Sequence, residues 1–474
     1  MPRPLSPGRS TSRRPAPGRP APGDLTARAG DLTALAAALT DRGIDLVRVL
    51  WSDLHGAARG KEIHVSEVSR FAAPGLSFCR AVMVTDLAGN PLDLPESSGG
   101  GWPDAHARID PETLAVPDHT PGTAYLLADL VEAGAGHPPL ALDPRGILRH
   151  QVDRLALRGL HAVAAPELEF YLLAPDPAGP LGWRQYSAHD TAGYTVGTAH
   201  DPDRLLSLMI RSCHALGLGV HAGNQEFSGG QFELNHTHGP ALRAADRAFL
   251  FKYTIKEIAA GRGLRATFMG KPFNGKAGSG QHVHLSLSGG DGVNLFADPA
   301  ADDGLSSLAR SFLAGILTHA PALTAVLNPT VNAYKRLAAP DSLAPAAADW
   351  GHDNRTAYAR IPPERGAGTR IEIRVADGAA NSHLVLAALL AAGLDGVERR
   401  LVPPPPVTGA PSGGGAPLPA GLRDALIALE RDTVLAAALG ARFTEVFIAM
   451  KRAELKRFES TVTEWEFREY ARML

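Results

Sequence analysis

Four short segments of the chain alternate apolar side chains with glutamate, histidine or arginine, and this alternation constrains the fold more than any other feature. Successive side chains of a β-strand point to opposite faces, so each segment predicts a strand with one apolar and one ionisable face. The segments are PELEFYLL (166–173), QFELNH (231–236), QHVHLSLS (281–288) and RIEIRVAD (370–377). Their polar faces carry Glu167 and Glu169, then Gln231 and Glu233, then His282, His284 and Ser286, then Arg370, Glu372 and Arg374.

For one such segment alone, the simpler interpretation is an antiparallel strand with its polar face in water. Solvent-facing strands usually carry Lys, Thr and Ser, whereas these four carry residues that serve better as ligands. If the four faces converge, their carboxylates repel one another unless cations lie between them. A hard divalent cation is the simplest choice, and a histidine among the ligands leaves both Mg²⁺ and Mn²⁺ open.

Arginines gather in the same part of the chain. Any one of them alone is more simply a structural surface residue. Together with a metal site they suit a polyanionic substrate, because guanidinium groups bind carboxylate and phosphate through two parallel hydrogen bonds. Metal ions and arginines are the groups that phosphoryl transfer requires. The residues are Arg336, Arg355, Arg360, Arg370 and Arg374.

The loop NGKAGSG (274–280) holds three glycines directly before the histidine strand. It could let backbone approach a ligand closely, although a hairpin turn is the simpler interpretation. Neither GxxxxGK[ST] nor a strand-to-helix GxGxxG occurs, so a P-loop or a Rossmann site is not indicated.

Composition excludes several classes of function. Lys and Arg number 47 and Asp and Glu 49, so a broad nucleic-acid surface is not expected. The two cysteines lie far apart, which fits a reducing, cytoplasmic location. No apolar run reaches the roughly 18 residues of a membrane-spanning helix. Residues 1–23, with five arginines, several prolines and no acid, predict a disordered tail.

The pattern along the rest of the chain predicts an α+β protein with two domains. A helix at 24–42, strands at 45–54 and 55–65 and the apolar runs AVMVTDL and AYLLADL predict a small mixed sheet in a domain at 24–140. A larger α/β domain at 141–474 follows, with a helix that starts near Asp143. The Pro/Gly-rich stretch 402–421 predicts an exposed loop without regular structure, and two helical segments close the chain.

Several longer motifs resemble the ordered signature motifs of the glutamine synthetase superfamily. They are GNQEFSGGQFEL, ATFMGKPFNGKAGSGQHVHLSL, NPTVNAYKRL and GTRIEIRVADGAANSHL. The match runs from about Val163 to Leu390, with weaker resemblance around Asp53–Lys61 and in the last 30 residues. The resemblance implies a small N-terminal β-grasp domain followed by a large glutamine-synthetase-type catalytic α/β domain.

The resemblance also implies a role for each matching residue. Two divalent metals would be held by Glu169, Glu226 and Glu233 and by Glu167, His282 and Glu372. ATP would lie near His284 and Ser286, with Arg355 and Arg360 on its phosphates. Glutamate would be held by Gly278, Arg336 and Arg374. Asp53 matches a catalytic aspartate donated by a neighbouring subunit, so a homo-oligomer, a dodecamer of two rings, is implied.

The implied reaction has two steps. The side-chain carboxylate of glutamate attacks the γ-phosphorus of ATP to give an acyl phosphate, and an amine then displaces phosphate. Phosphorylation is needed because a carboxylate is a poor electrophile, and metals and arginines offset the repulsion between the two anions.

Two positions depart from the family pattern. Ammonium-using members carry a glutamate after the YKRL motif that helps to bind and deprotonate ammonium, whereas this chain carries Leu343, or Ser342 if the alignment shifts by one residue. The asparagine that precedes the GSG sequence is replaced by Ala277. An apolar corner suits an alkyl-bearing amine better than a small cation, which needs negative charge. We therefore expect a ligase that forms γ-glutamyl amides from polyamines, ethanolamine or other organic amines.

Three alternatives stay open at this point. The chain could be a true glutamine synthetase in which another group serves as the base. It could be a structural or regulatory relative without catalysis, although all six expected metal ligands are present. It could also act on an acid related to glutamate, since Arg336 and Arg374 indicate an amino-acid carboxylate without specifying which.

Overall fold

The computed structural model describes residues 31–71, 73–179, 181–187, 189–190, 192–339, 343–409 and 414–474. The predicted tail at 1–23 and the beginning of the predicted helix at 24–42 lie outside the described residues. The part of that helix that is described is α2 (Leu32–Thr40), whose first turn is capped by the carboxylate of Asp31.

The N-terminal part forms a five-stranded mixed sheet, as predicted. Strands β1 and β5 pair in parallel and all other neighbours pair antiparallel, in the order β2-β1-β5-β4-β3. The AVMV run does not form a strand but a 3₁₀ turn at Arg80–Val84. The strands are β1 (Leu46–Ser52), β2 (Ala58–His64), β3 (Leu76–Cys79), β4 (Asp104–Ala115) and β5 (Thr123–Glu132).

The second sheet is larger and brings together the four strands with polar faces. Its main path runs β14-β15-β16-β12-β6-β9-β8, while β7, β10 and β11 each pair with the long strand β6. The predicted segments are β6 (His161–Pro175), β9 (Gln231–His236), β12 (Gln281–Ser288) and β16 (Ile371–Ile373), the last shorter than expected. The remaining strands are β7 (Trp183–Gln185), β8 (Val220–Gln225), β10 (Gly239–Pro240), β11 (Arg265–Thr267), β14 (Trp350–His352) and β15 (Ala359–Ile361).

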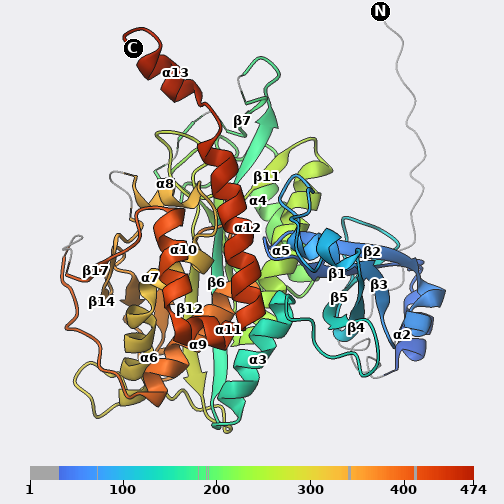
Figure 1. The fold of residues 1–474 in the computed structure, drawn as a ribbon, viewed down its shortest axis with the longest axis horizontal. Helices are drawn as coiled ribbons and strands as arrows, with labels where there is room; N and C mark the ends of the chain where they lie inside the picture. Colours follow the sequence, from blue (N-terminus) through green and yellow to red (C-terminus); the bar gives the residue numbers. More distant parts are fainter. Residues whose placement is uncertain are drawn as a thin grey trace, which may run out of the picture.

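Helices cover the larger sheet, and α9 is buried along almost all of its length. Figure 1 shows the small sheet at one end of the molecule and α9 to α12 in front of the larger sheet. The helices up to α9 are α3 (Pro144–Ala156), α4 (Leu205–Ala215), α5 (Ala241–Ala260), α6 (Ser307–Thr318), α7 (Ala320–Leu327), α8 (Ala333–Leu337) and α9 (Ser382–Glu398). The α+β organisation predicted from the sequence is confirmed.

The prediction of two closing helices was wrong, because this region holds α10 (Leu422–Arg431), α11 (Thr433–Leu439), α12 (Ala441–Glu459) and α13 (Glu464–Tyr470). Asp432 ends α10 and caps α11 through its side chain. Gly440, at a φ of 104°, then separates α11 from α12. The last helix, α13, projects from the body of the molecule (Figure 1).

The Pro/Gly-rich stretch 402–421 is irregular in its described part, with one exception. Its β17 (Ala416–Pro417) pairs with β13 (Ala347–Ala348). In the part of this stretch before β17, the carbonyl of Pro404 accepts a 2.6 Å hydrogen bond from the indole Nε1 of Trp350, and the N–H of Val407 donates to the carbonyl of Trp350. The expectation of a loop without regular structure was therefore wrong for two residues.

In the described part of the chain, no single helix is long and apolar enough to cross a membrane. Two bent pairs, α6 with α7 and α11 with the helices after it, have sufficient length and apolar character only when each pair is taken together.

Candidate active site

A cluster of carboxylates and imidazoles lies on one face of β6, β9 and β12. Nδ1 of His282 lies 3.1 Å from Oε1 of Glu167, and its Nε2 lies 3.7 Å from Oε1 of Glu169. Glu167, Glu233 and His282 each offer one possible ligand atom, and these three atoms lie within 4.8 Å of one another. These three residues can therefore contact a single cation, whereas the family resemblance assigns Glu233 to a different metal from Glu167 and His282.

Strand register explains why residues far apart in the sequence meet here. His282 pairs with Glu167 and His284 lies opposite Glu372, while Glu169 lies opposite Glu233. Directly opposed residues of neighbouring strands bring their side chains together on the same face. The convergence that the alternating pattern suggested is thus produced by the order β16-β12-β6-β9.

The carboxylates of the cluster differ in their affinity for protons. Burial, followed by the negative charges of Glu167 and Glu169, raises the pKa of Glu233 to about 10. Burial and the charge of Glu169 raise the pKa of Glu226 to about 7. Burial also opposes ionisation of Glu167, but hydrogen bonds from His282 and His284 hold its pKa well below its usual value. Crowding within the cluster therefore favours the protonated forms of Glu233 and Glu226.

This donor set fits divalent metal ions. Carboxylate oxygens with one imidazole are ligands that Mg²⁺ and Mn²⁺ accept, and buried carboxylates crowded together are stabilised when a cation replaces their protons. Glu226, at the end of β8, belongs to this set through its electrostatic interaction with Glu169. Nδ2 of Asn224 donates a 2.7 Å hydrogen bond to its Oε1 and fixes its orientation.

Glu372 is the centre of the arginine-rich side of the cluster. Its two carboxylate oxygens contact different arginines, Arg360 at 2.8 Å and Arg374 at 2.5 Å. Burial disfavours its charged form, but the nearby His282 and Arg374 lower its pKa to about 2. Arg360 also contacts Asp353 at 2.6 Å. Arg360 and Arg374, predicted to bind ATP and glutamate, are thus held beside the expected metal ligands.

Arg355 and Arg370 lie at the edge of this group. The carbonyl of Arg355 accepts a 2.8 Å hydrogen bond from Nε of Arg374, while the residue itself is exposed. Nε of Arg370 donates to Nδ1 of His284 at 3.2 Å. An exposed guanidinium beside the cluster is available to an anionic substrate.

Arg336 and Gly278 lie together on another side of the cluster. Nη2 of Arg336 donates to the carbonyls of Val375 and Ala376, at 2.5 and 2.6 Å. A methyl group at Gly278 would lie 2.6 Å from Cγ of Arg336. The backbone at Gly278 therefore lies so close to Arg336 that only glycine fits at this position.

Among the described residues, the side chains of Ser286 and Asp53, both predicted site residues, form no hydrogen bond or ion pair with the cluster. Ser286 is half-buried on β12, where it pairs with Val163. Asp53 is buried in the turn between β1 and β2, where its carboxylate accepts hydrogen bonds from the backbone of His55 and Ala57 and pairs with Arg59 at 2.9 Å. Its catalytic role at a neighbouring subunit's site stays a prediction.

The sequence reasoning missed the residues that orient the expected ligands. Asn224 supports Glu226, Asn235 donates to Oε1 of Glu233 at 3.1 Å, and the N–H of Gly280 donates to Oε2 of Glu169 at 2.9 Å. Both asparagines stand two residues from the glutamate that they contact. The same period of two that identified Glu233 could have found Asn235, whereas Asn224 supports a glutamate that only the family resemblance identified.

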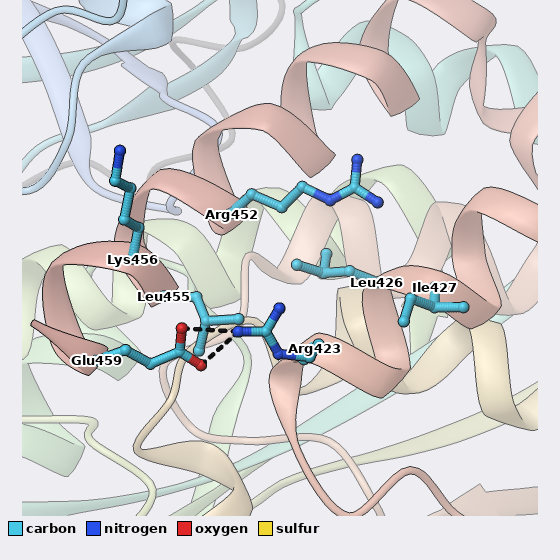
Figure 2. A pocket seen from close by; sticks show the side chains of 7 residues that line it. All are labelled: Arg423, Leu426, Ile427, Arg452, Leu455, Lys456 and Glu459. Carbon is cyan, nitrogen blue, oxygen red and sulfur yellow. Dashed lines mark hydrogen bonds and ion pairs between the residues drawn. The ribbon is translucent and has the colours of Figure 1, made fainter.

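A separate cavity of about 320 Å³ lies between α10 and α12 (Figure 2). An ion pair between Arg423 and Glu459 at 2.7 Å crosses it. None of the predicted site residues lines this cavity.

Comparison with known proteins agrees with this geometry. The family described as "Glutamine synthetase, catalytic domain" matches residues 141–470. The glutamine synthetase of Thermus thermophilus is 36% identical over 428 residues, which cover 82% of this chain and 94% of that protein. The glutamine synthetase of Methanocaldococcus jannaschii is 40% identical over 344 residues, which cover 70% of this chain and 75% of that protein.

Solved structures with the same fold include that of GmaS, a γ-glutamylmethylamide synthetase, in complex with ADP. It superposes with a TM-score of 0.82 at 35% identity and covers 93% of this chain and 99% of GmaS. GmaS without ligand gives a TM-score of 0.81 at the same identity. The chain therefore belongs to the glutamine synthetase family of ATP-dependent carbon–nitrogen ligases.

Proposed function

We propose that this protein joins an organic amine to the side-chain carboxylate of glutamate through a γ-glutamyl phosphate. The observation that carries the proposal is that the resemblance matches Leu343, or Ser342 if the alignment shifts by one residue, to the glutamate of ammonium-using relatives, and neither is a carboxylate. The side chain of Leu343 is half-exposed, so it is accessible to a small molecule. The likeness to GmaS over nearly the whole chain supports an organic acceptor.

In this proposal, Arg336, Arg374 and the backbone of Gly278 hold glutamate, and Arg355 and Arg360 face the phosphates of ATP. A carboxylate oxygen of glutamate attacks the γ-phosphorus, and the bond from that phosphorus to ADP breaks. The amine nitrogen then attacks the acyl carbon, the bond to phosphate breaks, and one proton of the amine passes to the departing phosphate.

The acidic cluster contributes charge balance to both steps. Glu167, His282 and Glu372 would hold one divalent cation, and Glu169, Glu226 and Glu233 another. Such cations, Mg²⁺ or Mn²⁺, neutralise charge when two anions approach each other. The chain's own contribution is to hold these ligands and arginines rigidly, since most of the ligands stem from the adjacent strands β16, β12, β6 and β9 and Arg360 stems from β15 beside them.

A homo-oligomer with shared active sites, a dodecamer by resemblance, is part of this proposal, as is a cytoplasmic location. Asp53 would then complete the site of a neighbouring subunit. Because its carboxylate is engaged by its own turn, this role requires that the turn present it across the interface. Light scattering of the purified protein measures the oligomer size directly.

Use of ammonium is the second candidate function. It is favoured by the relatives named glutamine synthetase, which are as similar to this chain as GmaS is. In that case a group other than residue 343 would deprotonate ammonium.

The experiment that separates the two is phosphate release from ATP with Mg²⁺ and glutamate and a panel of acceptors. The panel comprises ammonium, methylamine, ethanolamine, putrescine and spermidine. We expect a higher kcat/KM with one of the organic amines than with ammonium. A preference for ammonium over every organic amine would overturn the proposal and leave a glutamine synthetase.

A pair of variants tests the role of residue 343. Leu343→Glu restores a carboxylate and is expected to shift the kcat/KM ratio toward ammonium by about tenfold or more, because a nearby negative charge favours a small cation. Leu157→Glu is the matched control, since Leu157 is also an exposed leucine and lies at the end of α3. This control should leave the ratio unchanged.

A further inference from the structure

One buried carboxylate near the candidate site has no role in the function described so far. Asp377 is fully buried, and its Oδ1 accepts a 2.7 Å hydrogen bond from the N–H of Ala379. Its Oδ2 is buried without a hydrogen-bond partner among the described residues. A buried carboxylate is costly unless positive charge lies nearby, so its surroundings need explanation.

The positive charge comes from two buried cations, Arg336 and Lys252. Arg336 is 5% exposed and Lys252 is 8% exposed. Burial lowers the pKa of Arg336, and the charge of Asp377 is the largest influence that opposes this shift. Burial and the charge of Lys256 lower the pKa of Lys252 to about 7, and Asp377 opposes that shift also. Lys252 is otherwise engaged, because its Nζ donates to Oε1 of Gln281 and to the carbonyl of Ala380.

Two glycines allow this arrangement. A methyl group at Gly270 would lie 1.7 Å from Oδ2 of Asp377, so the carboxylate oxygen rests directly against this backbone. The carbonyl of Gly270 accepts a 2.9 Å hydrogen bond from the N–H of Ser279 and would lie 2.7 Å from a methyl group at Gly278. Gly278 in turn packs against the stem of Arg336. The carboxylate, the arginine and the glycine loop therefore form one packed unit.

Arg336 is also hydrogen-bonded to the backbone directly before Asp377. Nη2 of Arg336 donates to the carbonyls of Val375 and Ala376, the two residues directly before Asp377. Nε of Arg336 has no hydrogen-bond partner among the described residues. Arg374, the other arginine proposed to hold glutamate, has its own carboxylate in Glu372 at 2.5 Å. Arg374 thus contacts its carboxylate directly, whereas Arg336 and Asp377 form no ion pair among the described residues and are linked by charge and by the backbone of Val375 and Ala376.

We propose that Asp377 is a positioning residue, which balances the charge of Arg336 and fixes this arginine in the orientation that binds the carboxylate of the acid substrate. This inference rests on the proposed role of Arg336 and is independent of which amine is the acceptor. Asp377 touches neither substrate nor metal in this proposal and acts only through the arginine and the glycine loop.

The test is Asp377→Asn, which preserves the size of the side chain and an oxygen for the N–H of Ala379 but removes the charge. We expect the KM for glutamate to rise about tenfold or more, while the KM for ATP changes by less than about twofold. An unchanged KM for glutamate in the folded variant, or an equal rise in both KM values, would overturn the inference.

The matched control is Asp143→Asn. Asp143, at the start of α3, is a buried aspartate like Asp377, and its carboxylate likewise accepts backbone hydrogen bonds, from the N–H groups of Leu130 and Arg145. It lies outside the candidate site, so its loss should lower Tm without changing the KM for glutamate. If Asp377→Asn does not fold, Gly270→Ala gives the same readout, because its methyl group displaces Oδ2 of Asp377.

Arg336→Gln separates failure of this inference from failure of the proposed function. If it leaves the KM for glutamate unchanged, the binding role of Arg336 is wrong, and the inference falls with it. If it raises this KM but Asp377→Asn does not, only the role of Asp377 is overturned. The double variant should be no worse than Arg336→Gln alone, because the aspartate acts through the arginine, and additive losses would contradict this.

Discussion

His282 lies directly opposite Glu167 in the antiparallel pairing of β12 with β6, with Nδ1 of the imidazole 3.1 Å from Oε1 of the carboxylate. Glu167 belongs to a cluster of carboxylates in which burial and mutual repulsion raise some of the pKa values, that of Glu233 to about 10. Such a cluster is stabilised by a divalent cation, and its response to metal can be measured independently of catalysis.

We expect Mg²⁺ or Mn²⁺ to raise the Tm of the protein. At a metal concentration about 100 times the Kd, the gain in unfolding free energy is about 2.7 kcal/mol. Glu233→Gln should fold as well as the parent but lose most of this increase, because one ligand oxygen and one negative charge are gone. Differential scanning fluorimetry with and without metal checks this. Glu364→Gln, at an exposed glutamate paired with Arg370, should retain the full response.

Removal of Glu372 should cost far more stability than removal of an exposed glutamate. Its side chain is 2% exposed and pairs with Arg360 and Arg374, so Glu372→Ala leaves the buried Arg374 without this carboxylate and leaves Arg360 with Asp353 alone. We expect a loss of about 3–5 kcal/mol in the free energy of unfolding. Glu364→Ala should cost less than about 1 kcal/mol, as is usual for exposed ion pairs. Urea denaturation measures both, and equal losses would contradict the assignment.

The pH dependence of stability should include a contribution from His319. Its Nδ1 lies 2.5 Å from Asp432 and its Nε2 lies 3.0 Å from Asp395. Burial lowers its pKa, but the two aspartates outweigh burial and raise the pKa above its usual value of 6.5. A raised pKa in the folded state means that the stabilisation is complete below 6.5 and is lost as pH rises through the folded-state pKa.

His319→Gln should therefore cost more stability at about pH 6 than at about pH 9. Urea denaturation of both proteins at the two pH values gives this difference without interference from other titrating groups. An equal cost at both pH values would show that the imidazole is not charged in the folded protein.

The crossing of α6 and α9 should not tolerate a methyl group at Gly315. A Cβ there would lie 2.2 Å from the carbonyl of Ala392 and 2.7 Å from the backbone nitrogen of Gly396. Alanine favours helices by up to about 1 kcal/mol over glycine, but separating two packed backbones costs more. We expect Gly315→Ala to lose about 2 kcal/mol of unfolding free energy. Gly290→Ala, which meets no atom within 4 Å, should be nearly neutral in the same measurement.

Much of the site could be anticipated from local pattern, and the helix boundaries near the end of the chain show where such reasoning fails. The period of two identified Glu167, Glu169, Glu233, His282 and Glu372 because alternation is a property of the strand itself. The breaks at Asp432 and Gly440 were missed, although a capping aspartate and a glycine are recognisable signals. Resemblance to the family, and not alternation, pointed to Glu226.

The sequence by itself determined that this chain carries several strands with ionisable faces, set in an α+β protein of the glutamine synthetase family. Only the tertiary structure decided which strands are neighbours, and hence that Glu372 pairs with Arg360 and Arg374 and that Asp377 is buried against Gly270. The physical reason is that side-chain alternation depends on adjacent peptide units, whereas strand order, burial and ion pairing depend on contacts between segments that lie more than a hundred residues apart, as β6 and β12 do.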